Sequence, residues 1–253
     1  MRIVLASLAV LLIPLSATAG NVCEDDCGSS PVAGSRQLVV VTTDGWDTLK
    51  GTLRRYQRTN DRSAWRPVGG PVPVVVGKSG LAWGVGRHAS VPSGGPVKRE
   101  GDGRAPAGSF RLSSAFGYAP AGEMGWVRLP YIHSTEPVKC VDDVKSAYYN
   151  QVVDERTVTK DWDSKEDMRR RDHLYKLGVI VDHNWAAQTR PGAGSCIFLH
   201  IWQGPDTGTA GCTAMEEAAL TQVVRWLNPA RDPVLVQLPK AEYARLRREW
   251  KLP

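Results

Sequence analysis

Beyond its first twenty residues the sequence has no internal repeat, no low-complexity tract and no strong excess of one charge sign. Lys and Arg number 32 against 26 for Asp and Glu, a net charge of +6 at pH 7, which is too dilute to indicate a nucleic-acid partner. Apolar residues make up 42% and charged residues 23%, close to average globular usage, so a disordered or collagen-like chain is excluded. The sequence predicts a folded protein with a packed core.

Membrane-spanning runs are also lacking. The apolar stretch from Ile3 to Leu15 has 13 residues and contains Pro14, too short for the roughly 30 Å of a bilayer core. Arg2 precedes it and the small residues Ala17-Thr18-Ala19 follow it, which is typical of a signal peptide over residues 1–19. We expect an exported protein, periplasmic or secreted, with no integral membrane segment after cleavage.

Motifs for metals and phosphates are absent as well. His133, His173, His183 and Cys196 show no Cys-x-x-Cys or His-x-x-x-His spacing that would indicate zinc. The run 101–103, Gly-Asp-Gly, lacks the Lys-Ser/Thr ending of a phosphate loop and predicts a tight turn instead. We therefore expect no metal and no other cofactor.

The five cysteines are Cys23, Cys27, Cys140, Cys196 and Cys212. An odd number in an oxidising compartment predicts two disulfides and one free thiol. With Cys212 set aside, the other four allow three pairings, and the sequence does not choose among them.

The sequence contains 25 glycines and 17 prolines. This composition favours short strands joined by many turns. Residues 20–36 read as a leader or linker before one domain over 37–253. Strands are expected at 38–42, 72–76, 82–85, 109–112, 126–129, 179–182, 197–201 and 234–238. Helices are expected at 165–176, from Thr213 to Leu227 with a Thr213/Glu216 capping box, and at 239–252. The predicted fold class is α+β, mainly β.

Cys212 and His200 form the candidate catalytic couple. The predicted capping box places Cys212 just before a helix N-terminus, which would favour its thiolate. His200 lies in the apolar run CIFLHIW, and the glycine-rich loop QGPDTGTAG returns the chain to Cys212. A neutral imidazole can take a thiol proton and return it to a leaving amine. The amides of Gly211 and Cys212 are candidates for an oxyanion hole.

In this context FLHIW…TAGCTAM resembles the signature of the L,D-transpeptidase (YkuD-like) catalytic domain, in which a His precedes a Gly-Cys nucleophile by a loop. KREGDGRAPAGSFRLSSAFGY is similar to another segment of that family, and CVDDVKSAYYNQVVD and GVIVDHN resemble its long-loop branch. The resemblance covers residues 38–253 and implies a β-sandwich with a few peripheral helices.

The resemblance implies an exported cysteine acyltransferase acting on peptidoglycan stem peptides through a thioester. It makes Cys212 the nucleophile, His200 the base and acid, and the Ile201 carbonyl the group that orients the imidazole. Gly211 matches the glycine before the nucleophile, and Thr209 and Trp202 are expected to bind substrate. Hydrolysis by an L,D-carboxypeptidase or endopeptidase, and a non-catalytic wall-binding module, stay open as alternatives.

The sequence departs from the family pattern at the nucleophile. Most members have Ser-His-Gly-Cys-x-Arg, where this chain has Thr-Ala-Gly-Cys-Thr-Ala over 209–214. Arg99, Arg104 and Arg190 are candidate replacements for the missing arginine. Asp142 and Asp143 are adjacent acids that suit an amine if they line the cleft, although such pairs more often cap a turn.

Overall fold

The computed structural model describes residues 30–88 and 94–253. The predicted signal peptide, Cys23 and Cys27 lie outside these residues. The strands are β1 (Gln37–Thr43), β2 (Lys50–Gln57), β3 (Arg66–Val75), β4 (Leu81–Trp83), β5 (Ala105–Gly117), β6 (Tyr131–His133), β7 (Val138–Val141), β8 (Val152–Asp154), β9 (Lys165–Asp167), β10 (Leu177–Val181), β11 (Phe198–Ile201), β12 (Thr213–Met215) and β13 (Val234–Pro239). The helices are α1 (Glu217–Trp226) and α2 (Lys240–Leu246), with short 3₁₀ turns at Ala121–Glu123, Ala186–Gln188 and Pro229–Arg231. The expected class, mainly β with a few peripheral helices, is confirmed.

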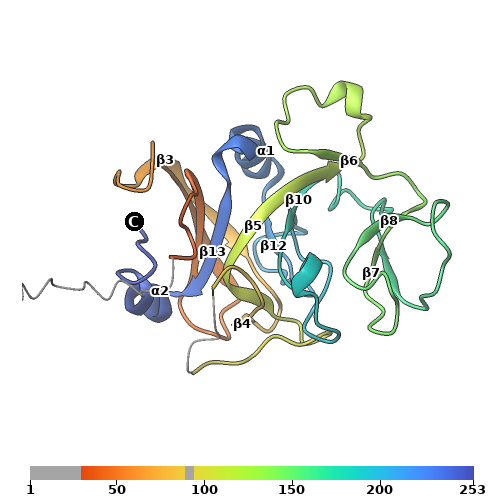
Figure 1. Ribbon diagram of the computed structural model, residues 1–253, viewed down its shortest axis with the longest axis horizontal. Helices are drawn as coiled ribbons and strands as arrows, with labels where there is room; N and C mark the ends of the chain where they lie inside the picture. The colour runs from red at the N-terminus through yellow and green to blue at the C-terminus, as the bar shows by residue number, and fades with distance from the viewer. Residues whose placement is uncertain (1–29, 89–93) are drawn as a thin grey trace, which may run out of the picture.

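Ten strands form one sheet in the order β10-β11-β12-β3-β2-β1-β13-β5-β4, with β6 beside β5. β10 also pairs with β5, so the sheet closes on itself around the core (Figure 1). β1 and β13 are buried along nearly their whole length and pair in parallel, as expected of continuous runs of Val and Leu. The closed sheet gives β11 and β12 a rigid frame.

β11 and β12 pair in parallel, with His200 opposite Ala214. Parallel neighbours need a crossover connection, and here residues 202–212 provide it. Cys212 is therefore the last residue of that connection, directly before β12.

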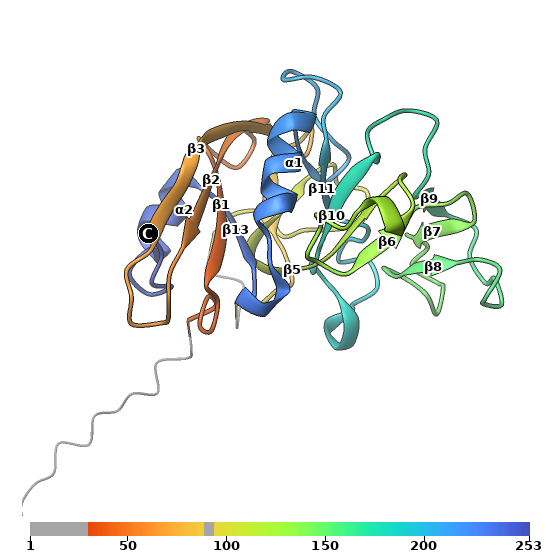
Figure 2. The same ribbon diagram turned by 90° about the horizontal axis from the view of Figure 1, so that it is seen from above.

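The prediction of a helix starting at Thr213 is wrong at its beginning. Thr213 belongs to β12, and α1 begins only at Glu217. The Thr213 hydroxyl donates to the Gln237 side chain at 2.6 Å instead of capping a helix. The apolar stripe itself is confirmed, because Leu220, Val223 and Val224 are buried against β10 and β11, beside which α1 lies (Figure 2).

A second sheet, β8-β7-β9, stands at the end of the molecule opposite α2 (Figures 1 and 2). We call residues 134–176, which contain it, the side lobe. The predicted helix at 165–176 is wrong: residues 165–167 form β9, which pairs with β7, and turns follow. A disulfide joins Cys140 of β7 to Cys196, so the lobe is covalently tied to the segment that leads into β11.

The remaining predicted elements differ in detail. Residues 126–129 form no strand. The predicted helix at 239–252 is shortened to α2, with Pro239 before its first turn. The Gly-Asp-Gly turn is present, with positive φ at Gly101 and Gly103, a conformation that glycine adopts without steric cost.

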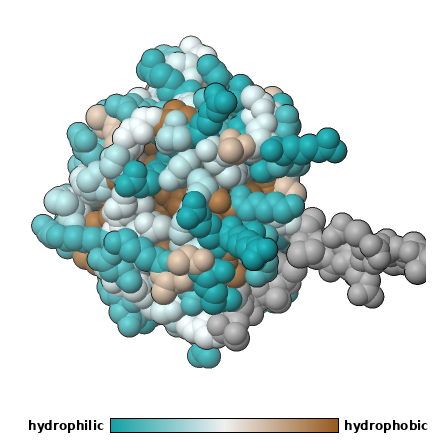
Figure 3. All heavy atoms as spheres, turned by 90° about the vertical axis from the view of Figure 1, so that its left-hand side faces the viewer, coloured by the Kyte–Doolittle hydropathy of each residue, from teal (hydrophilic) through white to brown (hydrophobic). Residues whose placement is uncertain are grey.

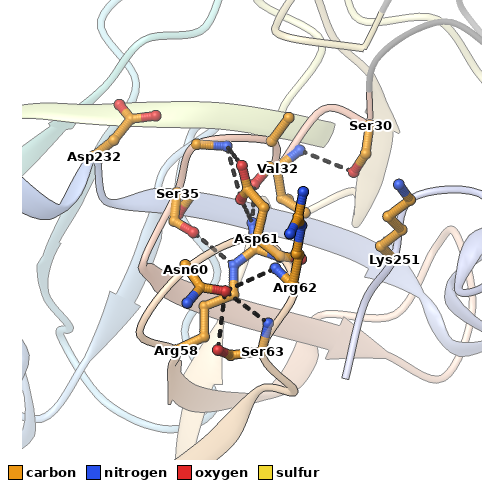
Figure 4. A network of polar contacts seen from close by, with 12 residues as sticks. Ser30, Val32, Ser35, Arg58, Asn60, Asp61, Arg62, Ser63, Asp232 and Lys251 are labelled. Atoms are coloured by element: carbon orange, nitrogen blue, oxygen red, sulfur yellow. Dashed lines mark hydrogen bonds and ion pairs between the residues drawn. The ribbon is translucent and has the colours of Figure 1, made fainter.

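The chain before β1 already packs on the domain from Ser30 onward. Val32 is fully buried, and the guanidinium of Arg58 donates to the carbonyls of Val32 and Ser35 and pairs with Asp61 (Figure 4). Polar residues cover most of the face at the left of Figure 1, as Figure 3 shows. None of the helices within the described residues is long and apolar enough to cross a membrane.

Candidate active site

A cavity of about 400 Å³ opens between the main sheet and the side lobe. The main sheet and its loops contribute His200 and residues 207–212, including Cys212. The lobe contributes Asp142, Glu166, Arg170 and Tyr175, and the Gly-Asp-Gly region contributes Lys98, Glu100 and Gly101. The structure thus places both members of the predicted Cys-His couple in the lining of one cavity.

The connection before Cys212 is held firmly against residues 76–78. The Lys78 amide donates to the Thr209 carbonyl at 2.8 Å, and the Thr209 amide donates to the Val76 carbonyl at 3.1 Å. A Cβ at Gly208 would stand 2.6 Å from the Lys78 Cα, so only glycine allows this close approach. These backbone contacts fix the position of the turn that carries the thiol.

Cys212 is a free and buried cysteine. Its Sγ accepts a hydrogen bond from the Phe198 amide at 3.3 Å, and its S–H points to the Cys196 carbonyl at 3.5 Å. Because no helix starts at Thr213, the predicted helix-dipole stabilisation of the thiolate is wrong. Burial instead raises the pKa of the Cys212 thiol, and the nearby Glu166 carboxylate acts in the same direction.

His200 is held by its own strand. Its Nδ1 lies 2.7 Å from the Ile201 carbonyl, and because a carbonyl only accepts, Nδ1 carries the proton and Nε2 has the free lone pair. Burial lowers the pKa of His200 to about 4, against the opposing effect of the Ile201 hydrogen bond. At rest the cavity therefore holds a neutral thiol and a neutral imidazole.

The predicted substrate-binding residues fall into different places. Gly211 and Thr209 line the cavity, but the Thr209 hydroxyl donates to the Cys212 carbonyl at 2.6 Å and accepts from the Gly211 amide at 3.2 Å. The Thr209 side chain thus stabilises the turn before Cys212. The Gly211 amide already donates to Thr209, so it is not free to bind an oxyanion in this structure. Trp202 is not among the residues that line the cavity, whereas its neighbour Gln203 is.

The two adjacent acids separate into two roles. Asp142 lines the cavity, while Asp143 accepts hydrogen bonds from the amides of Lys145 and Asp163 and so caps a turn. The turn-capping interpretation thus holds for Asp143, and Asp142 meets only the condition that it lines the cavity.

The basic residues that line the cavity are not the ones that the sequence suggested. Arg99, Arg104 and Arg190 do not line it, and Arg104 pairs with Asp47. Lys98 and Arg170 line it instead. Arg170 was hidden inside the segment expected to be helical, so no sequence pattern marked it as a site residue.

Sequence reasoning also missed Tyr175, Glu166 and Glu100. The Tyr175 ring lies edge-on to the His200 ring, with centroids 5.2 Å apart, and its hydroxyl donates to Glu166 at 2.6 Å. Burial raises the pKa of Tyr175 and of Glu166. The disulfide-tied lobe brings Tyr175 and Glu166 to the cavity, and the Gly-Asp-Gly region brings Glu100. No local motif reveals these contacts.

Comparison with known proteins connects this geometry to a family. The family model of the L,D-transpeptidase catalytic domain (YkuD) matches residues 50–236. Searches of individual curated proteins and of solved structures found no match. The matched range contains both His200 and Cys212 and every strand from β2 to β12, so the chain belongs to the L,D-transpeptidase catalytic domain family.

Proposed function

We propose that the protein is an exported L,D-transpeptidase that acylates Cys212 with a peptidoglycan stem peptide and passes the peptide to a second amine. One observation carries this: Cys212 and His200 line the same cavity, and the Ile201 carbonyl holds the imidazole with Nε2 unprotonated. A shared cavity and an imidazole with a free Nε2 lone pair both favour a thiol nucleophile with His200 as its base.

The first half of the reaction forms a thioester. The thiol turns its proton to Nε2 of His200 as Sγ attacks the carbonyl of the L-centre that precedes the terminal D-residue. The tetrahedral intermediate then collapses, the C–N bond breaks, and His200 returns the proton to the departing D-amino acid. The Cys212 amide, which has no acceptor among the described residues, is the candidate donor to the oxyanion.

The second half releases the peptide. An amine of a second stem attacks the thioester, gives a proton to His200, and expels Sγ, which recovers that proton. Because burial disfavours both the thiolate and the imidazolium, proton transfer accompanies attack instead of preceding it. The couple therefore acts by general-base catalysis and not through a preformed ion pair.

Mass spectrometry of the protein from residue 20 onward, incubated with purified disaccharide-tetrapeptide, tests the reaction, with Cys212→Ala as the matched control. We expect a tripeptide adduct on Cys212, free D-amino acid and cross-linked dimers, all absent from the control. Tripeptide without dimers would replace transpeptidation by the carboxypeptidase alternative. No product above the control would contradict thioester chemistry on stem peptides and leave the wall-binding alternative.

A further inference from the structure

The positive charge of the protein is concentrated in one half of the fold. Residues 30–76 and 229–253, which supply β1, β2, β3, β13 and α2, contain 13 Lys and Arg but only 6 Asp and Glu. Residues 77–228, which supply the candidate active site and the side lobe, contain 18 and 17. The half that contains α2, which lies away from the side lobe (Figures 1 and 2), therefore carries nearly all of the excess.

A second cavity, of about 500 Å³, opens in this half. The loop between β2 and β3 lines one side of it, and the chain that follows α2 lines the other. The Trp65 indole donates to the Lys251 carbonyl at 3.0 Å, and the Leu252 amide donates to the Arg247 carbonyl at 2.9 Å. These bonds hold the chain after α2 against the loop, so the cavity is a defined part of the fold.

The acid that lines this cavity is already bound within the protein. Asp61 is the only Asp or Glu in the lining among the described residues. It pairs with Arg58, and its two carboxylate oxygens also lie 3.0 and 3.1 Å from the Gly34 amide that donates to them (Figure 4). The terminal oxygen of Pro253, another lining residue, accepts from the Tyr243 hydroxyl. The negative groups of the cavity are thus already engaged.

Three cations of the same cavity are not engaged in this way. Arg62, Arg247 and Lys251 line it and are exposed. Within residues 30–88 and 94–253, none of the three forms a salt bridge. They come from both walls, as Figure 4 shows for Arg62 and Lys251. We call the cavity that these residues line the basic cavity.

We propose that the basic cavity binds a phosphate group of a linear polyanion. The planar fork of an arginine donates to two phosphate oxygens at once. A phosphate presents its oxygens tetrahedrally, so cations on two facing walls can share it, whereas the two oxygens of a carboxylate lie in one plane. Two arginines and a lysine from separate segments match the first geometry.

The surroundings of the basic cavity favour a polymer over a single ion or a membrane. Arg66 and Arg248 adjoin lining residues in the sequence, are exposed, and form no salt bridge among the described residues. They extend the positive charge beyond the cavity, where further phosphates of one chain would lie. The large exposed hydrophobic residues of the described chain are Val97 and Val144, both in the other half, so this half offers no apolar anchor for a bilayer.

Isothermal titration calorimetry with linear polyphosphate, at an ionic strength of about 0.15 M, tests the site on the protein from residue 20 onward. We expect polyphosphate to bind at least about tenfold more tightly than inorganic phosphate, because a chain brings further phosphates to the surface at high effective concentration. Arg62→Gln, Arg247→Gln and Lys251→Gln should each weaken polyphosphate binding about threefold or more. Thermal unfolding checks that each variant is folded.

Arg128→Gln is the matched control. It removes the same charge from an exposed arginine that does not line the basic cavity and forms no salt bridge within the described part of the chain. It should therefore leave the affinity for polyphosphate unchanged. Unchanged affinity in all three cavity variants, or the same loss in Arg128→Gln as in them, would overturn the site.

Two further ligands test the class of partner. Poly-L-glutamate of the same length should bind at least about threefold more weakly than polyphosphate, and equal affinity would overturn the choice of phosphate. Retention on phosphatidylglycerol vesicles without binding of free polyphosphate would replace the polymer by a lipid surface. Inorganic phosphate that binds as tightly as polyphosphate would show that a single ion is the ligand.

The acids Glu24, Asp25 and Asp26 stand a few residues before Ser30, whose hydroxyl donates to the Trp250 carbonyl next to the basic cavity. Neutralising all three, as Glu24→Gln/Asp25→Asn/Asp26→Asn, should leave polyphosphate affinity unchanged or raise it, because acids of the chain only compete with the polymer. Weaker binding by this variant would contradict an anion site.

Polyphosphate binding is independent of the proposed reaction, since the basic cavity and the candidate active site share no lining residue. Cys212→Ala should bind polyphosphate as the wild type does, and Arg62→Gln should acylate Cys212 from a soluble donor at the wild-type rate. Absence of acylation would contradict the proposed function alone, whereas loss of polyphosphate binding in Cys212→Ala would contradict the separation of the two sites.

Discussion

The main sheet and the side lobe differ in what holds them together. The main sheet encloses a large cluster of fully buried aliphatic residues, including Leu38, Val236 and Leu220. The lobe has three short strands, a smaller buried cluster that includes Val138 and Met168, and part-buried polar contacts such as that of Lys139 with Asp167. The candidate couple comes from the first region, and the cavity residues Asp142 and Glu166 come from the second.

The two regions thus contribute different groups to the cavity. Cys212 and His200 are fixed by the register of β11 and β12, which the closed sheet enforces. Asp142 follows the end of β7, and Glu166 stands opposite Cys140 in the β7–β9 pairing. Since Cys140 is bonded to Cys196, one covalent link sets the lobe's carboxylates against the couple.

Loss of the base in the main sheet should have the largest effect. His200→Ala should lower the rate of Cys212 acylation by about 10²- to 10⁴-fold, because a positioned general base contributes a factor of this size. Single-turnover mass spectrometry of the acyl-enzyme measures this. Retention of more than a tenth of the wild-type rate would contradict the role of His200, and thermal unfolding of the variant provides the control for folding.

Removal of the disulfide should destabilise the side lobe more than the main sheet. The bond closes a loop with a sequence separation of 56, for which chain-entropy arguments give about 4 kcal/mol. For the double variant Cys140→Ala/Cys196→Ala we expect loss of hydrogen-exchange protection in β7, β8 and β9 while β1 and β13 stay protected. Uniform loss of protection across both regions would show that they unfold as one unit.

The same contrast explains what the sequence could predict. Strands built from consecutive Val, Leu and Ile, such as β1, β10, β11 and β13, were identified with nearly correct bounds because burial on both faces leaves a continuous apolar run. β2, with the sequence KGTLRRYQ, was missed because only two of its side chains are buried.

The errors cluster where distant contacts override local patterns. Thr213 and Glu216 match a capping box, yet pairing with β11 draws Thr213 into β12. Residues 165–176 carry acids at one end and glycine after the other, but pairing with β7 makes 165–167 a strand. The Cys-His couple was predictable because one short connection joins the two residues in the sequence. The approach of Asp142 and Glu166 depends instead on a lobe tied by a disulfide whose pairing the sequence left open.

Shortening an apolar side chain should destabilise the protein more in the main sheet's core than in the side lobe. Leu220 is fully buried on α1. Leu220→Ala should lower the protein's free energy of unfolding by about 3 kcal/mol, as is usual for buried Leu residues. Val152 of β8 is only half-buried, so Val152→Ala should cost about 1 kcal/mol or less. Urea titration followed by circular dichroism gives both values, and equal costs would contradict the difference in packing.

The smallest expected effect concerns the thiol, which is influenced by both regions. Burial by the main sheet and the charge of Glu166 from the lobe raise the pKa of Cys212, and His200, with a pKa of about 4, stays neutral above about pH 5. The thiolate fraction should therefore grow about tenfold per pH unit from pH 6 to 9, with no plateau near neutrality. Initial rates of iodoacetamide alkylation measure this fraction.

Glu166→Gln removes the carboxylate charge that raises the pKa of Cys212 but leaves the thiol buried. The pH profile of alkylation should therefore shift to lower pH by a few tenths of a unit while keeping its slope. Asp206→Asn, with its charge lost outside the cavity, should retain the wild-type profile. A plateau between pH 5 and 7 in the wild type would instead indicate a thiolate-imidazolium pair. In that case the transfer of the proton would precede attack, although both the burial and the Glu166 charge disfavour the thiolate.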